Sequence, residues 1–82
     1  MSRIPRNIGG QELVKLLGKF GYIVIRQTGS HIRLTSELKG KVHVITIPDR
    51  NPVKIGTLNN ILNDISAYLG IDKKKLVKEL FG

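Results

Sequence analysis

The stretch YIVIRQTGSHIRLT, residues 22–35, decides the fold of this 82-residue chain. Its first half, Tyr22–Thr28, is rich in the β-branched and aromatic residues that are typical of a strand. The pair Gly29-Ser30 is typical of a two-residue hairpin turn. Polar and apolar residues then alternate over His31–Thr35, which predicts a second strand with its polar side chains facing outward. The sequence therefore predicts a β-hairpin with one wet face.

An amphipathic helix is predicted immediately before the hairpin. Within residues 10–20, apolar side chains recur at spacings of three and four, which places them on one helix face. These side chains are Leu13, Leu16, Leu17 and Phe20. Gly21 is a natural left-handed stop for this helix. Residues 1–8 come before it and are predicted to form a lead-in arm.

The residues after the hairpin complete an α+β fold. Lys41–Ile47 predicts a third strand, closed by Pro48. Thr57 is the expected N-cap of a second helix that ends at Gly70, and Asp72 is the expected N-cap of a short third helix. Strands joined in sequence form an antiparallel sheet, which helices cover on one face. We expect residues 1–82 to form a single domain.

The charge of the chain points to a polyanionic partner. Fourteen Lys and Arg against six Asp and Glu give a formal net charge of +8, and nucleic acid is the commonest partner for such a surface. The chain has no cysteine and only two histidines, well apart, so neither a disulfide framework nor a metal site is expected. No apolar run approaches membrane-spanning length and no signal peptide is evident, so we expect a cytoplasmic protein without a membrane or small-molecule cofactor role.

The outward residues of the hairpin carry the functional groups that RNA cleavage requires. By alternation, His31 and Arg33 share one side of their strand, and Arg26 and Thr28 flank the same turn on the neighbouring strand. An imidazole transfers protons near neutral pH, and guanidinium groups bind phosphate oxygens. The attacking 2′-hydroxyl comes from the RNA itself, so this chemistry does not require a metal. We therefore interpret His31 as a candidate catalytic residue, with Arg26 and Arg33 as phosphate ligands.

Other interpretations remain open at this stage. A single histidine at the start of a strand is most often a surface residue without a task, and His43 lies on a strand face that the sequence leaves ambiguous. The same charge and fold also fit a non-catalytic module that binds double-stranded RNA. A third alternative is an interaction protein whose basic face serves only an acidic partner.

Several ordered segments from residue 10 onward resemble the HicA toxin family, the small RNA-cleaving toxins of bacterial toxin–antitoxin pairs. The helix and the turn that follows it, the Gly-Ser-His sequence, the end of the third strand and the start of the second helix all contribute to the resemblance. The corresponding segments are Glu12–Leu17, Phe20–Tyr22, Gly29–His31, Ile45–Pro48 and Gly56–Leu58.

The resemblance implies a fold and an activity. The fold would be like that of double-stranded-RNA-binding domains, α-β-β-β-α with a short C-terminal helix. The activity would be cleavage of messenger RNA without a metal ion, with His31 as the catalytic residue. A HicB-type antitoxin would be the partner that covers the active face. Further RNA contacts would come from Gly29 and Ser30 in the turn, and from Lys54 and Thr57 near the start of the second helix.

Overall fold

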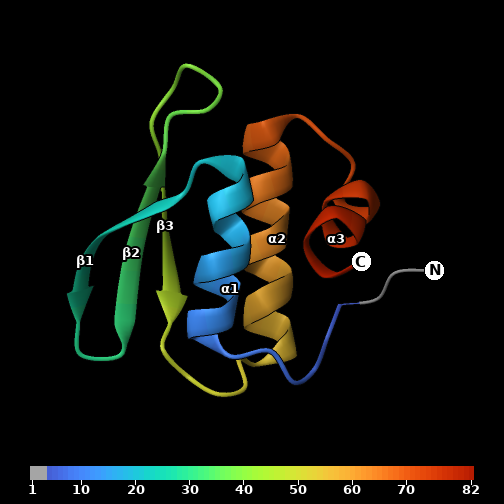
Figure 1. Cartoon of the computed structure of the whole chain (residues 1–82). Helices are drawn as coiled ribbons and strands as arrows, with labels where there is room; N and C mark the ends of the chain where they lie inside the picture. The colour runs from blue at the N-terminus through green and yellow to red at the C-terminus, as the bar shows by residue number, and fades with distance from the viewer. Residues whose placement is uncertain (1–3) are drawn as a thin grey trace.

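The computed structural model describes residues 4–82 and confirms the α+β prediction. Three antiparallel strands form one sheet in the order β1-β2-β3, and helices cover one side of it (Figure 1). The elements are α1 (Gly10–Leu17), the 3₁₀ helix η1 (Gly18–Phe20), β1 (Ile23–Thr28), β2 (His31–Ser36), β3 (His43–Pro48), α2 (Ile55–Leu69) and α3 (Lys73–Phe81). Residues 1–3 of the predicted lead-in arm lie outside the described residues.

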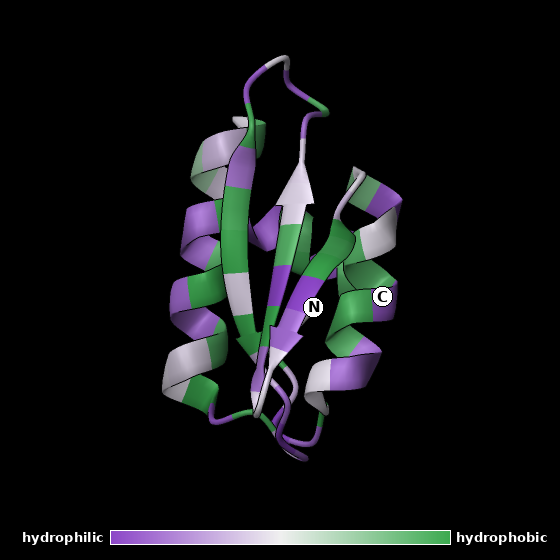
Figure 2. Ribbon diagram, turned by 90° about the vertical axis from the view of Figure 1, so that its left-hand side faces the viewer, coloured by the Kyte–Doolittle hydropathy of each residue, from purple (hydrophilic) through white to green (hydrophobic). Residues whose placement is uncertain are grey.

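The core lies between the sheet and the helices. On β2, Ile32 and Leu34 are buried while His31 and Arg33 are exposed, as the alternation predicted. The helices contribute leucines and isoleucines spaced three and four apart, so that each helix turns one stripe toward the sheet. The fully buried members include Leu13, Leu17, Leu58, Leu62 and Ile65. The described part of the chain leaves the other sheet face uncovered, as Figure 2 shows. Among residues 4–82, no helix combines the length and the apolar character needed to cross a bilayer.

The first helix ends differently from the prediction. The α-helix ends at Leu17, and the last predicted turn, Gly18–Phe20, is a tighter 3₁₀ helix. The amide of Gly21 donates to the Gly18 carbonyl (3.0 Å), and Gly21 itself is left-handed with φ +79°. A 3₁₀ turn satisfies the last carbonyls of a helix while narrowing it. The chain can therefore turn back at Gly21 and enter β1 directly.

The prediction that Thr57 caps the second helix is wrong. The helix begins three residues earlier, at Ile55, with the extended residue Lys54 as its N-cap. The amide of Leu58 donates to the Lys54 carbonyl (2.9 Å), which closes the first turn without a side-chain cap. The buried side chain of Val53, whose amide donates to the Ile8 carbonyl (2.8 Å), fixes where the chain turns. Backbone anchoring therefore sets this helix start, and a strong capping residue does not.

The third strand begins two residues later than predicted. Lys41 and Val42 remain in the loop, and pairing starts where His43 lies opposite Ser36. The buried Ser36 holds this end of the sheet, because its hydroxyl donates to the Phe20 carbonyl (2.9 Å). The same oxygen accepts from the amide of Leu38 (3.2 Å). The prediction for the third helix is confirmed, since the Asp72 carboxylate accepts from the Lys74 amide (2.8 Å).

Candidate functional site

The register of the sheet arranges the outer face in cross-strand rows. Thr28, His31 and Pro48 lie opposite one another and form one row. Arg26, Arg33 and Thr46 form the next row. Residues that lie directly opposite each other have Cβ atoms about 5 Å apart, and rows two residues apart along a strand are separated by about 6.6 Å. Three strands thus bring an imidazole, two guanidinium groups and two hydroxyl groups within reach of one small anion.

A bulge in β1 lies directly beside this arrangement. Val24 pairs with Leu34 and Arg26 pairs with Arg33, so Ile25 is an extra residue without a partner. From the Gly29-Ser30 turn the ladder is regular as far as Arg26, which lies opposite Arg33, and the shift affects only the residues before Ile25. Bulges often re-aim side chains next to functional sites. Here the extra residue lies beyond Arg26, and it brings Ile23 instead of Val24 onto the face that carries His31.

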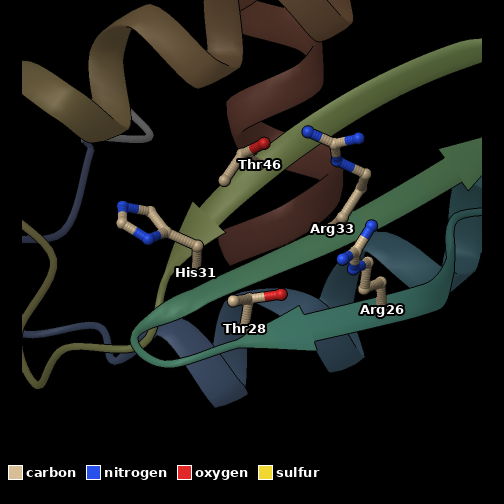
Figure 3. A pocket seen from close by; sticks show the side chains of 5 residues that line it. All are labelled: Arg26, Thr28, His31, Arg33 and Thr46. Atoms are coloured by element: carbon tan, nitrogen blue, oxygen red, sulfur yellow. The ribbon is translucent and has the colours of Figure 1, made fainter.

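The side chains of the two rows line an open cleft of about 490 Å³. Its lining residues are Arg26, Thr28, His31, Arg33 and Thr46. Figure 3 shows these five side chains standing on one face of the sheet around a common space. All five are exposed, and none carries a carboxylate. The cleft is therefore positively charged, accessible to water and supplied with hydrogen-bond donors.

The pairing of Arg26 with Arg33 is unfavourable for folding alone. Like charges directly opposite each other on neighbouring strands destabilise a sheet. An anion between the two guanidinium groups replaces this repulsion with attraction. Each guanidinium group can then donate hydrogen bonds to an oxygen of a phosphate. The arrangement therefore favours an anion, such as a phosphate group, between the two side chains.

The turn beside His31 is held in place by the loop that follows β3. Gly29 has φ +57° and Ser30 does not have a positive φ, as in type II′ hairpin turns. The amide of Asp49 donates to the Ser30 carbonyl (2.7 Å), and the side-chain amide of Gln27 donates to the Asp49 carboxylate (3.1 Å). These bonds fix the end of the sheet from which the imidazole of His31 projects.

Lys54 and Thr57 do not line the cleft. Both are exposed at the start of α2, in the helical layer. Figure 1 shows that α2 starts at the same end of the molecule as the turn between β1 and β2. The structure therefore places two groups of predicted site residues at one end: the cleft with its turn, and the first turn of α2.

The structure resolves the ambiguity over His43, which belongs to the packing on the helical side. Its ring stacks on Tyr68 at a centroid distance of 4.6 Å, and its Nδ1 shares a hydrogen bond with the Tyr22 hydroxyl (2.7 Å). Burial raises the pKa of the Tyr22 phenol above its ordinary value of 10.0, and the nearby Tyr68 and Asp64 add to that shift. His31 is consequently the histidine available on the open face.

Thr28 and Thr46 are cleft residues that the sequence prediction did not include among its site residues. Thr46 lies between the buried residues Ile45 and Ile47, so strand alternation could have placed it on the outer face. Its position opposite Arg33 depends on the register between β2 and β3. A sequence without known pairings does not reveal that register.

An apolar patch adjoins the cleft toward the loop between β2 and β3. Ile23, Thr35 and Val44 form the third cross-strand row, and Ile23 and Val44 are 62% and 48% exposed. The upper part of the sheet in Figure 2 is correspondingly greener than the part below. We call the exposed apolar residues at this end the apolar edge: Ile23, Val24, Ile25, Leu38, Val42 and Val44. Patches of this kind commonly mark a binding surface.

Comparison with known proteins identifies the family. The family described as "HicA toxin of bacterial toxin–antitoxin" matches residues 10–66, from the start of α1 into α2, and this segment contains the whole cleft. No curated protein and no solved structure matched the chain. The family match covers well over half of the 82 residues. The chain therefore belongs to the HicA toxin family of bacterial toxin–antitoxin systems.

Proposed function

We propose that this toxin is a metal-independent endoribonuclease that cleaves messenger RNA in the cleft on the outer sheet face. The observation that carries the proposal is the exposed imidazole of His31 in a cleft with two guanidinium groups and no lining carboxylate. Family membership supports a toxin role. A toxin that acts on messenger RNA would work in the cytoplasm.

In the proposed reaction, His31 accepts the proton of a ribose 2′-hydroxyl. The 2′-oxygen attacks the adjacent phosphorus, the bond from phosphorus to the 5′-oxygen breaks, and the leaving oxygen takes a proton from water. The products are a 2′,3′-cyclic phosphate and a 5′-hydroxyl. In the alternative scheme His31 is the general acid: it donates the proton to the leaving 5′-oxygen, and water takes the proton of the 2′-hydroxyl.

The other cleft residues bind and orient the phosphate. Arg26 and Arg33 neutralise the charge that develops on the non-bridging oxygens, and in this scheme they take the part that a metal ion plays elsewhere. The hydroxyls of Thr28 and Thr46 donate to the same oxygens. Gly29 and Ser30 let the backbone of the turn approach the RNA closely.

The contacts outside the cleft extend this binding site. Lys54 and Thr57 are proposed to hold a neighbouring phosphate, since α2 starts at the same end of the molecule as the turn. A helix N-terminus favours anions through its backbone amides and dipole. This placement parallels the RNA contacts that the family resemblance implies.

The test is cleavage of a labelled RNA in the presence of a chelator. His31→Ala should lower the cleavage rate by roughly a hundred- to ten-thousandfold, the usual contribution of general acid–base catalysis. His43→Phe is the matched control, because it changes the other histidine, keeps a ring against Tyr68 and lies on the helical side. An alanine variant that cuts as fast as wild type would end the catalytic assignment.

A non-catalytic module for double-stranded RNA is the second candidate. The observation that favours it is the openness of the site, with the turn and the start of α2 at one end of the molecule. It predicts that RNA stays intact with excess protein, while binding weakens steeply as salt rises. Cleavage products that His31→Ala abolishes would exclude it.

We further propose that a HicB-type antitoxin docks on the apolar edge and from there covers the cleft. The edge is continuous with the cleft through the shared register, and no strand among residues 4–82 pairs with the outer edge of β1. An acidic partner would complement the arginine row while apolar residues of the partner bury Ile23 and Val44. An exposed strand edge also permits addition of a partner strand.

Two substitutions in the apolar edge test this docking. Ile23→Lys combined with Val44→Lys should weaken antitoxin binding at least tenfold, because it places charge in an apolar interface. The control is Ile55→Lys, an equally apolar residue that is 37% exposed at the start of α2. Equal effects of the two variants in a binding titration would locate the antitoxin elsewhere.

A further inference from the structure

The third helix carries a basic face that takes no part in the cleft. Within α3, Lys74, Lys75 and Lys78 are exposed. The apolar residues of the helix, including Leu76 and Leu80, are buried on its other side. The three lysines line a shallow groove together with Glu79 and Gly82, with a volume of about 570 Å³. This helix lies outside residues 10–66, the segment that matches the toxin family.

Helix stability does not account for this basic face. The first turn of α3 contains lysines and no acidic residue, although the positive end of the helix dipole disfavours cations there. Lys78 follows Lys74 by four residues and Lys75 by three, and like charges at these spacings repel each other on a helix surface. Lys74 and Lys75 in the first turn therefore oppose the local folding preference, whereas the dipole favours Lys78 in the last turn. Such violations are expected where a surface serves binding.

Other contacts hold α3 rigidly, and they do not involve the three exposed lysines. The Asp72 carboxylate caps the helix start, and the Lys73 ammonium donates to the side-chain oxygen of Asn59 in α2. Near the other end, the Lys19 ammonium donates to the Glu79 carbonyl (2.8 Å). The lysine face thus stands on a fixed support, which lowers the entropic cost of binding an extended polyanion.

The position of α3 separates this face from the cleft. In Figure 1, the sheet lies on one side of the α1–α2 layer and α3 lies on the other. A stretch of RNA held by Arg26 and Arg33 on the outer sheet face therefore does not reach the α3 lysines without passing around the molecule. The lysine face has to contact a different stretch or a different molecule.

We propose that the α3 lysine face, Lys74, Lys75 and Lys78, is a second RNA-binding surface that contacts the phosphate backbone without reading sequence. The choice of RNA as the polyanion rests on the proposed function of the cleft. Lysine ammonium groups act as point charges toward phosphates, and neutralised phosphates release counterions. Membrane binding is disfavoured because Leu76, Val77 and Leu80 are buried, and the half-buried Phe81 is the single large apolar residue of α3 left to contact lipid. The surface would hold the toxin on RNA while its cleft faces away.

The experiment measures binding of a fluorescently labelled RNA duplex across a series of KCl concentrations. The full chain carries His31→Ala throughout, so that the probe is not cut. One variant adds Lys74→Gln, Lys75→Gln and Lys78→Gln. The matched control adds the same loss of charge elsewhere, at the exposed residues Lys15, Lys39 and Lys41. Thermal melts confirm that both variants fold.

The expected result is weaker binding by the α3 variant and a shallower salt dependence. The slope of log K against log[KCl] should fall by about two to three, close to one unit per lost phosphate contact, whereas the control should keep most of its slope. Equal losses in both variants would show that net charge alone matters, and this would overturn the proposal. An unchanged RNA slope with weakened binding to the antitoxin would assign the face to a protein and also overturn it.

This result is separable from the proposed catalytic function. Cleavage is measured on the chain with its native His31, and its absence would remove the nuclease assignment. The duplex titration uses the His31→Ala background and would still report whether α3 binds phosphates.

Discussion

At the scale of single residues, the position of His31 depends on a glycine that lies far from it in sequence. Gly10 begins α1, and its amide donates to the Arg50 carbonyl (2.8 Å). A Cβ at this position would lie 2.2 Å from the Pro48 carbonyl oxygen, well inside any permitted contact. Pro48 pairs directly with His31. Because Gly10 has no side chain, the start of α1 can pack against the end of β3, which lies beside His31.

Gly10→Ala is accordingly expected to destabilise the protein. The methyl group meets backbone atoms that belong to β3, so the cost should be about 1–3 kcal/mol, as for other overpacked positions. The melting temperature should fall by several degrees for each kcal/mol in a domain of this size. Gly56→Ala is the control, because nothing lies within 4 Å of a Cβ there. That change, in the first turn of α2, should be neutral or stabilising by up to about 1 kcal/mol. Similar melting temperatures for the two variants would contradict this account.

At the scale of elements, the register between strands determined what the sequence could and could not reveal. Alternation in β2 placed His31 and Arg33 on the outer face correctly, because both neighbours of Arg33 are buried apolar residues. The two-residue turn likewise placed Arg26 beside Arg33 correctly, whereas the face of Ile23 depends on the bulge at Ile25, which no local feature of the run from Ile23 to Gln27 indicates. Thr46 was missed for a related reason, since its neighbour across the sheet depends on the register.

The start of α2 shows a second limit of local prediction. Thr57 is a good capping residue, yet the helix starts at Ile55 because tertiary contacts of Val53 fix the chain before it. Intrinsic capping preference contributes about 1 kcal/mol, so a buried anchor and a backbone hydrogen bond override it readily. The overall α+β order was predictable, because apolar periodicity in helices and strands extends over many residues.

A serine at the end of β2 joins two elements, and its removal should be costly. The Ser36 hydroxyl donates to the Phe20 carbonyl in η1 and accepts from the Leu38 amide in the following loop. Ser36→Ala leaves both backbone groups without this partner in a part-buried place, at a cost of about 1–3 kcal/mol. Ser66→Ala is the control, because its hydroxyl donates only to the Asn63 carbonyl within α2 (3.0 Å). Chemical denaturation measures the stability of both variants. Equal denaturation midpoints for Ser36→Ala and Ser66→Ala would disprove the role of Ser36 in joining the two elements.

At the scale of the whole molecule, the aromatic cluster of Tyr22, His43 and Tyr68 joins the sheet to α2. Tyr22 precedes β1, His43 begins β3 and Tyr68 lies near the end of α2, with ring centroids 4.6–6.5 Å apart. The cluster lies on the helical side, whereas the cleft occupies the other face. Stability and proposed chemistry therefore depend on opposite faces of one thin sheet, and each can be altered without changing residues of the other.

The raised pKa of Tyr22 makes the stability of the protein depend on pH in the alkaline range. Burial keeps the phenol protonated in the folded state above pH 10, where an unfolded tyrosine loses its proton. The stability that this shift contributes is fully present below pH 10 and is lost as the pH rises above that value, by about 1.4 kcal/mol per pH unit. Phenylalanine has no ionisable hydroxyl, so the Tyr22→Phe variant should not show this loss of stability above pH 10.

The comparison of wild type with Tyr22→Phe tests this pH dependence directly. At pH 8 the wild type should be more stable by about 1 kcal/mol, because the variant loses the hydrogen bond to His43. By about pH 11 the wild type should have lost a similar amount of unfolding free energy through ionisation of Tyr22 in the unfolded chain. The difference in stability between the two proteins should therefore approach zero near this pH and change sign above it. A difference in unfolding free energy that stays constant from pH 8 to 11 would show that Tyr22 ionises equally in the folded and unfolded chains.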